Sequence, residues 1–170
     1  MKKAALSLIV LALLAPAPSR AQAHDYTAIK QQLELFETVL NTALKQRYDQ
    51  QRFMLLQPAK GTYLEGFGVV FTLETNLSTL RYLTPFTPGP YTDKEIKDAR
   101  AEKTARTKEV EAMVKGLLRD HGAGLNFLKP EDNVAVVVHL FNTSEHKGMP
   151  SQLIVQGKKV ALDKTTAVLF

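Results

Sequence analysis

The sequence predicts an α+β protein with a mainly antiparallel sheet of three to five strands and two long helices packed on one face. Three observations predict this class. Residues 25–56 and 92–120 carry apolar side chains at three- and four-residue spacings, which is typical of amphipathic helices. Residues 61–78 alternate between two faces as a strand does. The segment after residue 133 is rich in valine, which indicates further strands.

The N-terminal 23 residues predict a cleaved secretory signal peptide. Lys2 and Lys3 provide a basic start, and residues 4–15 form an apolar run that is too short to span a bilayer. Residues 21–23 read Ala-Gln-Ala, which is a small-x-small cleavage site. We therefore expect an exported protein, periplasmic or secreted, with an uncleaved membrane anchor as the alternative.

Composition limits the functions open to residues 24–170, which we expect to form a single α+β domain without a transmembrane segment. The whole chain has a formal net charge of +5. Three of these charges lie in the leader at Lys2, Lys3 and Arg20, so the remainder is close to neutral and gives no reason to expect nucleic-acid binding. The chain has no cysteine, which excludes disulfides and thiolate nucleophiles.

The first helix is expected over residues 25–56. Residues 53–56 form a dense apolar patch near its expected end, and Pro58 and Gly61 should stop it. We interpret it as a helix that packs on the core, because the repeat is too short for a coiled coil, and a partner-binding helix is the alternative. Its apolar stripe consists of Ile29, Leu33, Phe36, Leu40 and Leu44.

The central strand, residues 61–78, is unusual because Gly66 and Gly68 leave one of its faces nearly bare. Glycine inside a strand marks a bulge, a bend or a close backbone approach. We therefore expect one long strand, bent near the two glycines and covered there by other backbone or by a helix. The alternative is a ligand that approaches Gly66 and Gly68, with Glu65 at the rim.

A proline-rich loop is expected after this strand. Residues 76–83 fit a weak second strand or a short helical turn, and three prolines and a glycine between residues 85 and 90 forbid regular structure. Phe86 and Tyr91 interleave with the prolines. We interpret them as aromatic side chains that attach a stiff connector to the core, with a proline-rich contact segment as the alternative.

The second helix should begin at a capping box, in which Thr92 is followed three residues later by Glu95. It should run to about Asp120 and end at His121 and Gly122, with the glycine in a left-handed cap.

Residues 134–141 are apolar on both parities and predict a strand buried on both faces. A further strand is expected over residues 152–156, with a turn or bulge at 157–159 and a possible continuation at 160–162. We expect the apolar end of the chain, residues 168–170, to pack on the domain.

Two stretches resemble a group of uncharacterised exported bacterial proteins. Residues 63–71 carry a Tyr-x-x-Gly-aromatic-Gly-x-x-Phe pattern. Residues 117–140 carry the end of a helix, a Pro-Glu-Asp turn and a valine-rich strand. The group has no assigned activity, so the resemblance implies export and a similar fold but no functional residue.

The four histidines give the sharpest chemical hypotheses. No two of them have a metal-ligand spacing on one helix. If cleavage follows residue 23, His24 becomes the first residue, and its amino group and imidazole could bind copper with a second histidine. A Ser144–His146 nucleophile pair lacks the glycine-rich turn of a hydrolase. His139 is expected to be a packed core histidine.

The leading functional hypothesis is a small non-catalytic binding or interaction module with an unknown protein or small-molecule partner. Its weak candidate residues are Glu65, Gly66, Gly68, Phe86 and Tyr91. The alternatives are a periplasmic copper-binding protein that uses His24 and a hydrolase in which Glu65 lies near the histidines.

Overall fold

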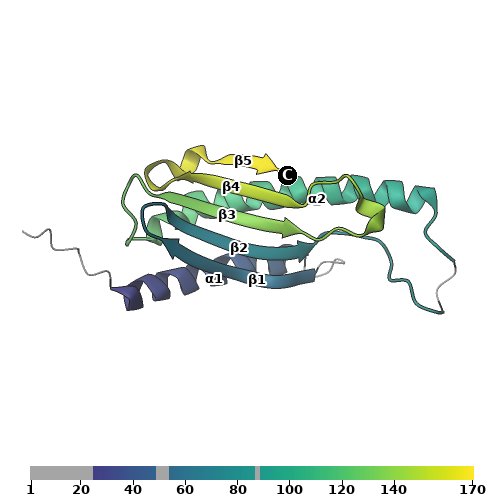
Figure 1. Cartoon of the computed structure of the whole chain (residues 1–170), viewed down its shortest axis with the longest axis horizontal. Helices are drawn as coiled ribbons and strands as arrows, with labels where there is room; N and C mark the ends of the chain where they lie inside the picture. Colours follow the sequence, from purple (N-terminus) through teal and green to yellow (C-terminus); the bar gives the residue numbers. More distant parts are fainter. Residues whose placement is uncertain (1–24, 49–53, 87–88) are drawn as a thin grey trace, which may run out of the picture.

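The structure is a computed structural model that describes residues 25–86 and 89–170, apart from residues 49–53. It confirms the α+β class: five strands form one sheet, and two long helices lie together behind it (Figure 1). No described element covers the other face of the sheet (Figure 1). The elements are α1 (Tyr26–Tyr48), β1 (Met54–Leu64), β2 (Gly68–Asn76), α2 (Asp93–His121), β3 (Asn133–Leu140), β4 (Gln152–Lys158) and β5 (Thr166–Leu169), with short 3₁₀ turns η1 (Gly122–Gly124), η2 (Ser144–His146) and η3 (Lys159–Lys164).

The strands lie in sequence order, β1-β2-β3-β4-β5. Neighbours are antiparallel except for β2 and β3, which are parallel because α2 carries the chain back to the starting end of the sheet. The core lies between the helices and the sheet, where Phe36 of α1 packs on Phe71 of β2 with ring centroids 4.7 Å apart. Among the described residues, no helix has the length and apolar character needed to cross a membrane.

The first helix is shorter than expected, because residues 54–56, Pro58 and Gly61 belong to β1 rather than to the helix or its stop. β1 is an edge strand, and there a proline costs no ladder hydrogen bond when it faces outward. Side chains of α1 bind this edge: Asn41 Oδ1 accepts from Ala59 N at 2.8 Å, and Glu37 Oε1 accepts from Gly61 N at 2.8 Å. The helix thereby satisfies the donors that a further strand would use.

The central stretch is a hairpin and not one bent strand. β1 ends at Leu64, β2 begins at Gly68, and the chain turns between them with φ of +79° at Gly66 and +127° at Gly68. A Cβ at Gly68 would lie 2.1 Å from the carbonyl oxygen of Asn133, so the expected close backbone approach is present at this glycine. The backbone that approaches is the start of β3.

The second helix begins as expected, because Thr92 and Glu95 form both hydrogen bonds of the capping box. Its end differs from the prediction: Gly122 has φ of −62° and continues into η1 instead of forming a left-handed cap. A Cβ at Gly122 would lie 2.3 Å from the end of the Leu162 side chain, which would have to shift to accept it. Residues 77–84 form neither a strand nor a helical turn.

Three expectations for the C-terminal half need correction. β3 is not fully buried on both faces, since Val137 and His139 on the uncovered face are only half-buried. Residues 157–158 extend β4, while residues 160–162 lie in η3. The chain end forms the edge strand β5, whose Val168, Leu169 and the following Phe170 remain exposed. Val137 and His139 remain partly exposed because both helices lie on the other face of the sheet (Figure 1).

Candidate functional site

The glycine candidates lie at a turn and do not line a cavity. Glu65 and Gly66 are exposed in the β1–β2 hairpin turn, and Gly68 is buried under Asn133. Both Asn133 N and Asn133 Nδ2 donate to Phe67 O, at 2.7 and 3.0 Å. Asn133 therefore occupies the space beside Gly68 at this end of the sheet and leaves no room there for a ligand.

The proline-rich loop places its two candidates differently. Tyr91 lines a cavity and donates its hydroxyl to Arg81 O at 2.7 Å, which joins the end of the loop to its start. Phe86 is 97% exposed at the far part of the loop and attaches it to nothing described. Tyr82 and Leu83, on the same loop, are also exposed.

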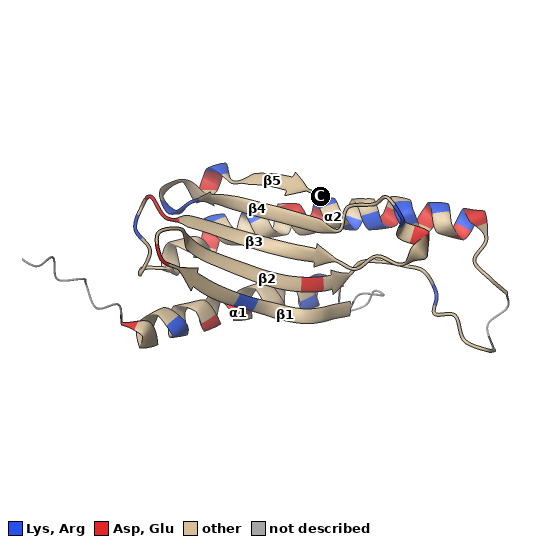
Figure 2. Cartoon of the chain, in the orientation of Figure 1, with Lys and Arg blue, Asp and Glu red and all other residues tan. Residues whose placement is uncertain are grey.

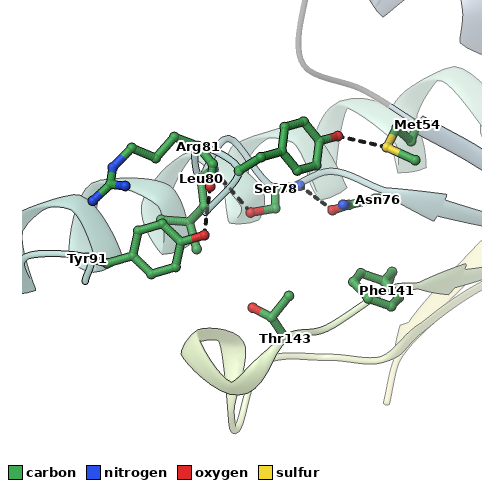
Figure 3. A pocket seen from close by; sticks show the side chains of 9 residues that line it. Met54, Asn76, Ser78, Leu80, Arg81, Tyr91, Phe141 and Thr143 are labelled. Atoms are coloured by element: carbon green, nitrogen blue, oxygen red, sulfur yellow. Dashed lines mark hydrogen bonds between the residues drawn. The ribbon is translucent and has the colours of Figure 1, made fainter. Parts of the chain in front are cut away.

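The cavity that Tyr91 lines has a volume of about 140 Å³ and lies at the carboxyl ends of the two parallel strands. Its walls come from three places: the start of β1, the chain that follows β2, and the chain that follows β3 (Figure 3). Carboxyl ends of parallel strands are a common place for binding sites, because adjacent chains separate there. The lining residues are Met54, Asn76, Ser78, Leu80, Arg81, Tyr82, Tyr91, Phe141 and Thr143.

Two consecutive side-chain turns shape the wall that follows β2. Asn76 Oδ1 accepts from Ser78 N at 2.9 Å, and Ser78 Oγ accepts from Leu80 N at 3.2 Å (Figure 3). Such local bonds offer the backbone an alternative to a strand ladder or a helix. The chain therefore leaves the sheet at Asn76 and bends around the cavity.

Arg81 closes the loop that follows these turns. Its Nε donates to Glu95 Oε1 at 3.0 Å, and its Nη2 donates to the carbonyls of Gly89 and Pro90 at 3.2 and 3.1 Å. Its guanidinium also lies 5.2 Å from the centroid of the Tyr91 ring. The start and the end of the loop are thus joined at one side chain, and residues 82–86 project beyond the sheet (Figure 1).

The cavity combines apolar walls with a few polar groups. Met54, Tyr82 and Phe141 are 43%, 65% and 40% exposed at its rim. The Tyr82 hydroxyl points to Met54 Sδ at 2.9 Å. Within the described residues, no hydrogen bond uses Asn76 Nδ2, so this amide can still donate. A mainly apolar hollow with a few convergent polar groups is the usual composition of a binding site.

Basic side chains of α2 support the wall that follows β3. Lys103 is only 1% exposed, and its Nζ donates to Phe141 O and to Asn142 Oδ1. Burial lowers the pKa of Lys103 to about 8. Arg100 Nη1 donates to the carbonyls of Glu145 and Lys147 at 2.9 and 3.1 Å.

Figure 2 shows acidic and basic residues alternating along α2, whereas the strands carry few charges.

His139 and His146 do not assemble with the acidic candidate. His139 lies in register with Glu74 toward the carboxyl end of β3, whereas Glu65 lies in the turn at the other end of that sheet. The hydroxyl of Ser144 donates to Glu145 Oε1 at 2.9 Å rather than to His146. His24 lies outside the described residues. No three His, Asp or Glu side chains in the described residues are grouped so as to hold a metal ion.

A second hollow, of about 460 Å³, lies at the other end of α2, between Leu128, Val160 and Leu162. Its one lysine, Lys159, already donates to the carbonyls of Gly122 and Ala123 at 2.6 and 2.8 Å and thereby caps the end of α2. This hollow is more open to solvent than the smaller cavity, and it does not lie at the ends of the two parallel strands. We therefore take the cavity at the strand ends as the candidate site.

Comparisons with protein-family models, with curated proteins and with solved structures found no match to this chain.

Proposed function

We propose that the protein is an exported binding module that holds an extended segment of a partner protein, with one apolar side chain of that segment in the cavity lined by Tyr82 and Phe141. The observation that carries the proposal is the position and lining of the cavity at the carboxyl ends of β2 and β3. The leader expected from residues 1–23 supports a role outside the cytoplasm.

The size of the cavity favours a side chain over a whole small molecule. Sites for drug-sized ligands have volumes of about 300–1,000 Å³, whereas an apolar cavity of about 150 Å³ accommodates a single benzene ring. The cavity of about 140 Å³ thus suits one tyrosine, phenylalanine or leucine side chain.

The surroundings favour a peptide. Exposed apolar side chains continue from the cavity rim along the loop, at Tyr82, Leu83 and Phe86. Exposed aromatic and apolar side chains beside a cavity suit an interaction site, because aromatic side chains dominate the affinity of protein interfaces. The amide of Asn76 can donate to a carbonyl of an extended backbone.

Selection from a random peptide library tests this function. Peptides displayed on phage are selected on the immobilised chain from His24 to Phe170 and on two variants, Tyr82→Ala and Tyr26→Ala. Both tyrosines are strongly exposed, 65% and 72%, but only Tyr82 lines the cavity. We expect a consensus with an aromatic or leucine residue, bound about tenfold more weakly or worse by Tyr82→Ala and unchanged by Tyr26→Ala. The absence of any consensus, or equal binding by Tyr82→Ala, would refute the proposal.

A further inference from the structure

In the described part of the chain, the hydrogen bonds between α2 and the segment Phe141–Lys147, which forms one wall of the cavity, come from two basic side chains. Lys103 and Arg100 donate to three of its carbonyl oxygens and to the Asn142 side chain. No ion pair joins Lys103 to a carboxylate in the described residues. The attachment is thus made by two basic groups with hydrogen-bond acceptors, and an additional positive charge beside them would weaken it.

His146 is buried within this segment in a neutral form. It is 1% exposed, and its Nδ1 lies 3.3 Å from Thr143 N and 2.8 Å from Thr143 Oγ1. The backbone N–H can only donate, so Nδ1 must be the acceptor and the ring proton must lie on Nε2. Nε2 is buried and has no hydrogen-bond partner among the described residues.

A second proton on this ring would disturb the hydrogen bonds between His146 and Thr143 and the attachment of the segment to α2. It would sit on Nδ1 and oppose the N–H of Thr143, and it would bring a third positive charge next to Lys103 and Arg100. Burial lowers the pKa of His146, and so do Lys103 and Arg100 of α2, while Glu145 of the same turn acts in the opposite direction. The neutral form is therefore the one that the folded segment accommodates.

We propose that His146 makes the cavity sensitive to pH: its protonation releases Phe141–Lys147 from α2 and opens the cavity wall that Phe141 and Thr143 form. The link to binding rests on the proposed function, but the release of the segment does not.

The sign follows from the direction of the shift. The pKa of His146 in the folded segment lies below the ordinary value of about 6.5, so the released state binds the proton more readily. The segment stays attached to α2 above about pH 6.5 and is released as the pH falls through the lower pKa of His146 in the folded segment.

Nuclear magnetic resonance on the chain from His24 to Phe170, without any ligand, tests the release. The imidazole of His146 and the amides of Thr143 and Lys147 are followed from about pH 7.5 to about pH 5, with the amide of Val155 in β4 as the internal reference. The variants are His146→Gln, which cannot titrate, and His139→Gln as the matched control. His139 is half-buried on the uncovered sheet face, and within the described residues its ring contacts Gln152 and forms no hydrogen bond to the segment or to α2.

We expect the amides of Thr143 and Lys147 to lose their neutral-pH positions together with the titration of His146, below its ordinary pKa, while Val155 does not move. The same loss is expected in His139→Gln and not in His146→Gln. Unchanged segment amides at about pH 5, or a His146 imidazole that titrates at or above about 6.5, would overturn the proposal. The second criterion uses the wild-type chain and holds even if His146→Gln does not fold.

The test separates this proposal from the proposed function. Binding of p-cresol, the side-chain analogue of tyrosine, is measured at both pH values. Binding at neutral pH that is lost in acid supports both proposals, and binding that is equal at both values contradicts the pH sensitivity. If p-cresol binds at neither value, the proposed function fails, while the titration of the segment is still decided by its amides.

Discussion

Replacement of Gly68 by alanine should destabilise the protein far more than replacement of Gly66. Both glycines have positive φ, +127° and +79°, but their surroundings differ. A Cβ at Gly66 meets nothing within 4 Å, whereas a Cβ at Gly68 would lie 2.1 Å from Asn133 O and 2.7 Å from Asn133 N. The pair therefore separates backbone strain from a steric clash.

The magnitude follows from these contacts. Backbone strain alone costs about 1–2 kcal/mol for alanine in the left-handed region, and this is the whole effect expected for Gly66→Ala. At Gly68 the strain is about 1–3 kcal/mol. Asn133 must also move, which breaks its two hydrogen bonds to Phe67 O at a cost of about 1 kcal/mol each. The total for Gly68→Ala is about 3–5 kcal/mol, a large part of the stability of an ordinary domain.

Urea unfolding of the wild type and of both variants measures the two values. Equal free energies of unfolding for Gly66→Ala and Gly68→Ala would refute the role of Gly68 as the point where β3 begins against β2. A ligand that approaches the glycines, the alternative from the sequence, predicts only the cost of backbone strain in both variants, without the added clash at Gly68.

Three further predictions concern stability. With Lys103 at a pKa of about 8, the free energy of unfolding of the wild type should rise by about 2 kcal/mol between about pH 7 and about pH 10, because in this range the unfolded chain binds the proton of Lys103 more tightly than the folded one. In Lys103→Met, urea unfolding should not show this rise. The same dependence of the free energy of unfolding on pH in both proteins would contradict the buried charge. The range stops at pH 10 because burial and Glu109 raise the pKa of Tyr48 to about 12, which lowers stability above it. Asn41→Ala should lower the free energy of unfolding by about 1–3 kcal/mol because Ala59 N loses its acceptor, whereas Asn41→Asp keeps an acceptor and should lose less; a neutral Asn41→Ala would show that α1 does not satisfy the edge of β1. Thr92→Ala should cost about 1 kcal/mol through the N-cap of α2, with Thr92→Ser close to wild type, and helix content by circular dichroism should fall only slightly.

The parts of the fold that depend on local sequence were predictable. The start of α2 followed from Thr92 and Glu95, and the α+β class followed from the periodicity of its segments. The end of α1 was not predictable from the sequence, because residues 54–56 continue an apolar stripe that suits a helix. Only their pairing with residues 74–76 of β2 makes them a strand. Strand pairing of this kind is non-local, so no window of sequence contains it.

The candidate site was predictable only at Tyr91. Its other walls come from the start of β1 and the ends of β2 and β3. The antiparallel register of β1 and β2 places Met54 beside Asn76, and the parallel register of β2 and β3 places Thr75 beside the distant Leu140. One local signal was available: Asn76-Leu77-Ser78 has the spacing of consecutive side-chain turns, which marks the exit from β2. Lys103 carried no signal, because in sequence it is one of many charged residues on α2.

The proposed binding requires that the cavity at the ends of β2 and β3 accept one apolar side chain. The most direct measurement is the change in amide chemical shifts of the chain from His24 to Phe170 on titration with p-cresol at neutral pH. We expect saturable shifts at Asn76, Ser78 and Phe141, with the amides around Leu162 unmoved. Shifts confined to the hollow around Leu128 and Leu162, or no saturable shift at all, would contradict it.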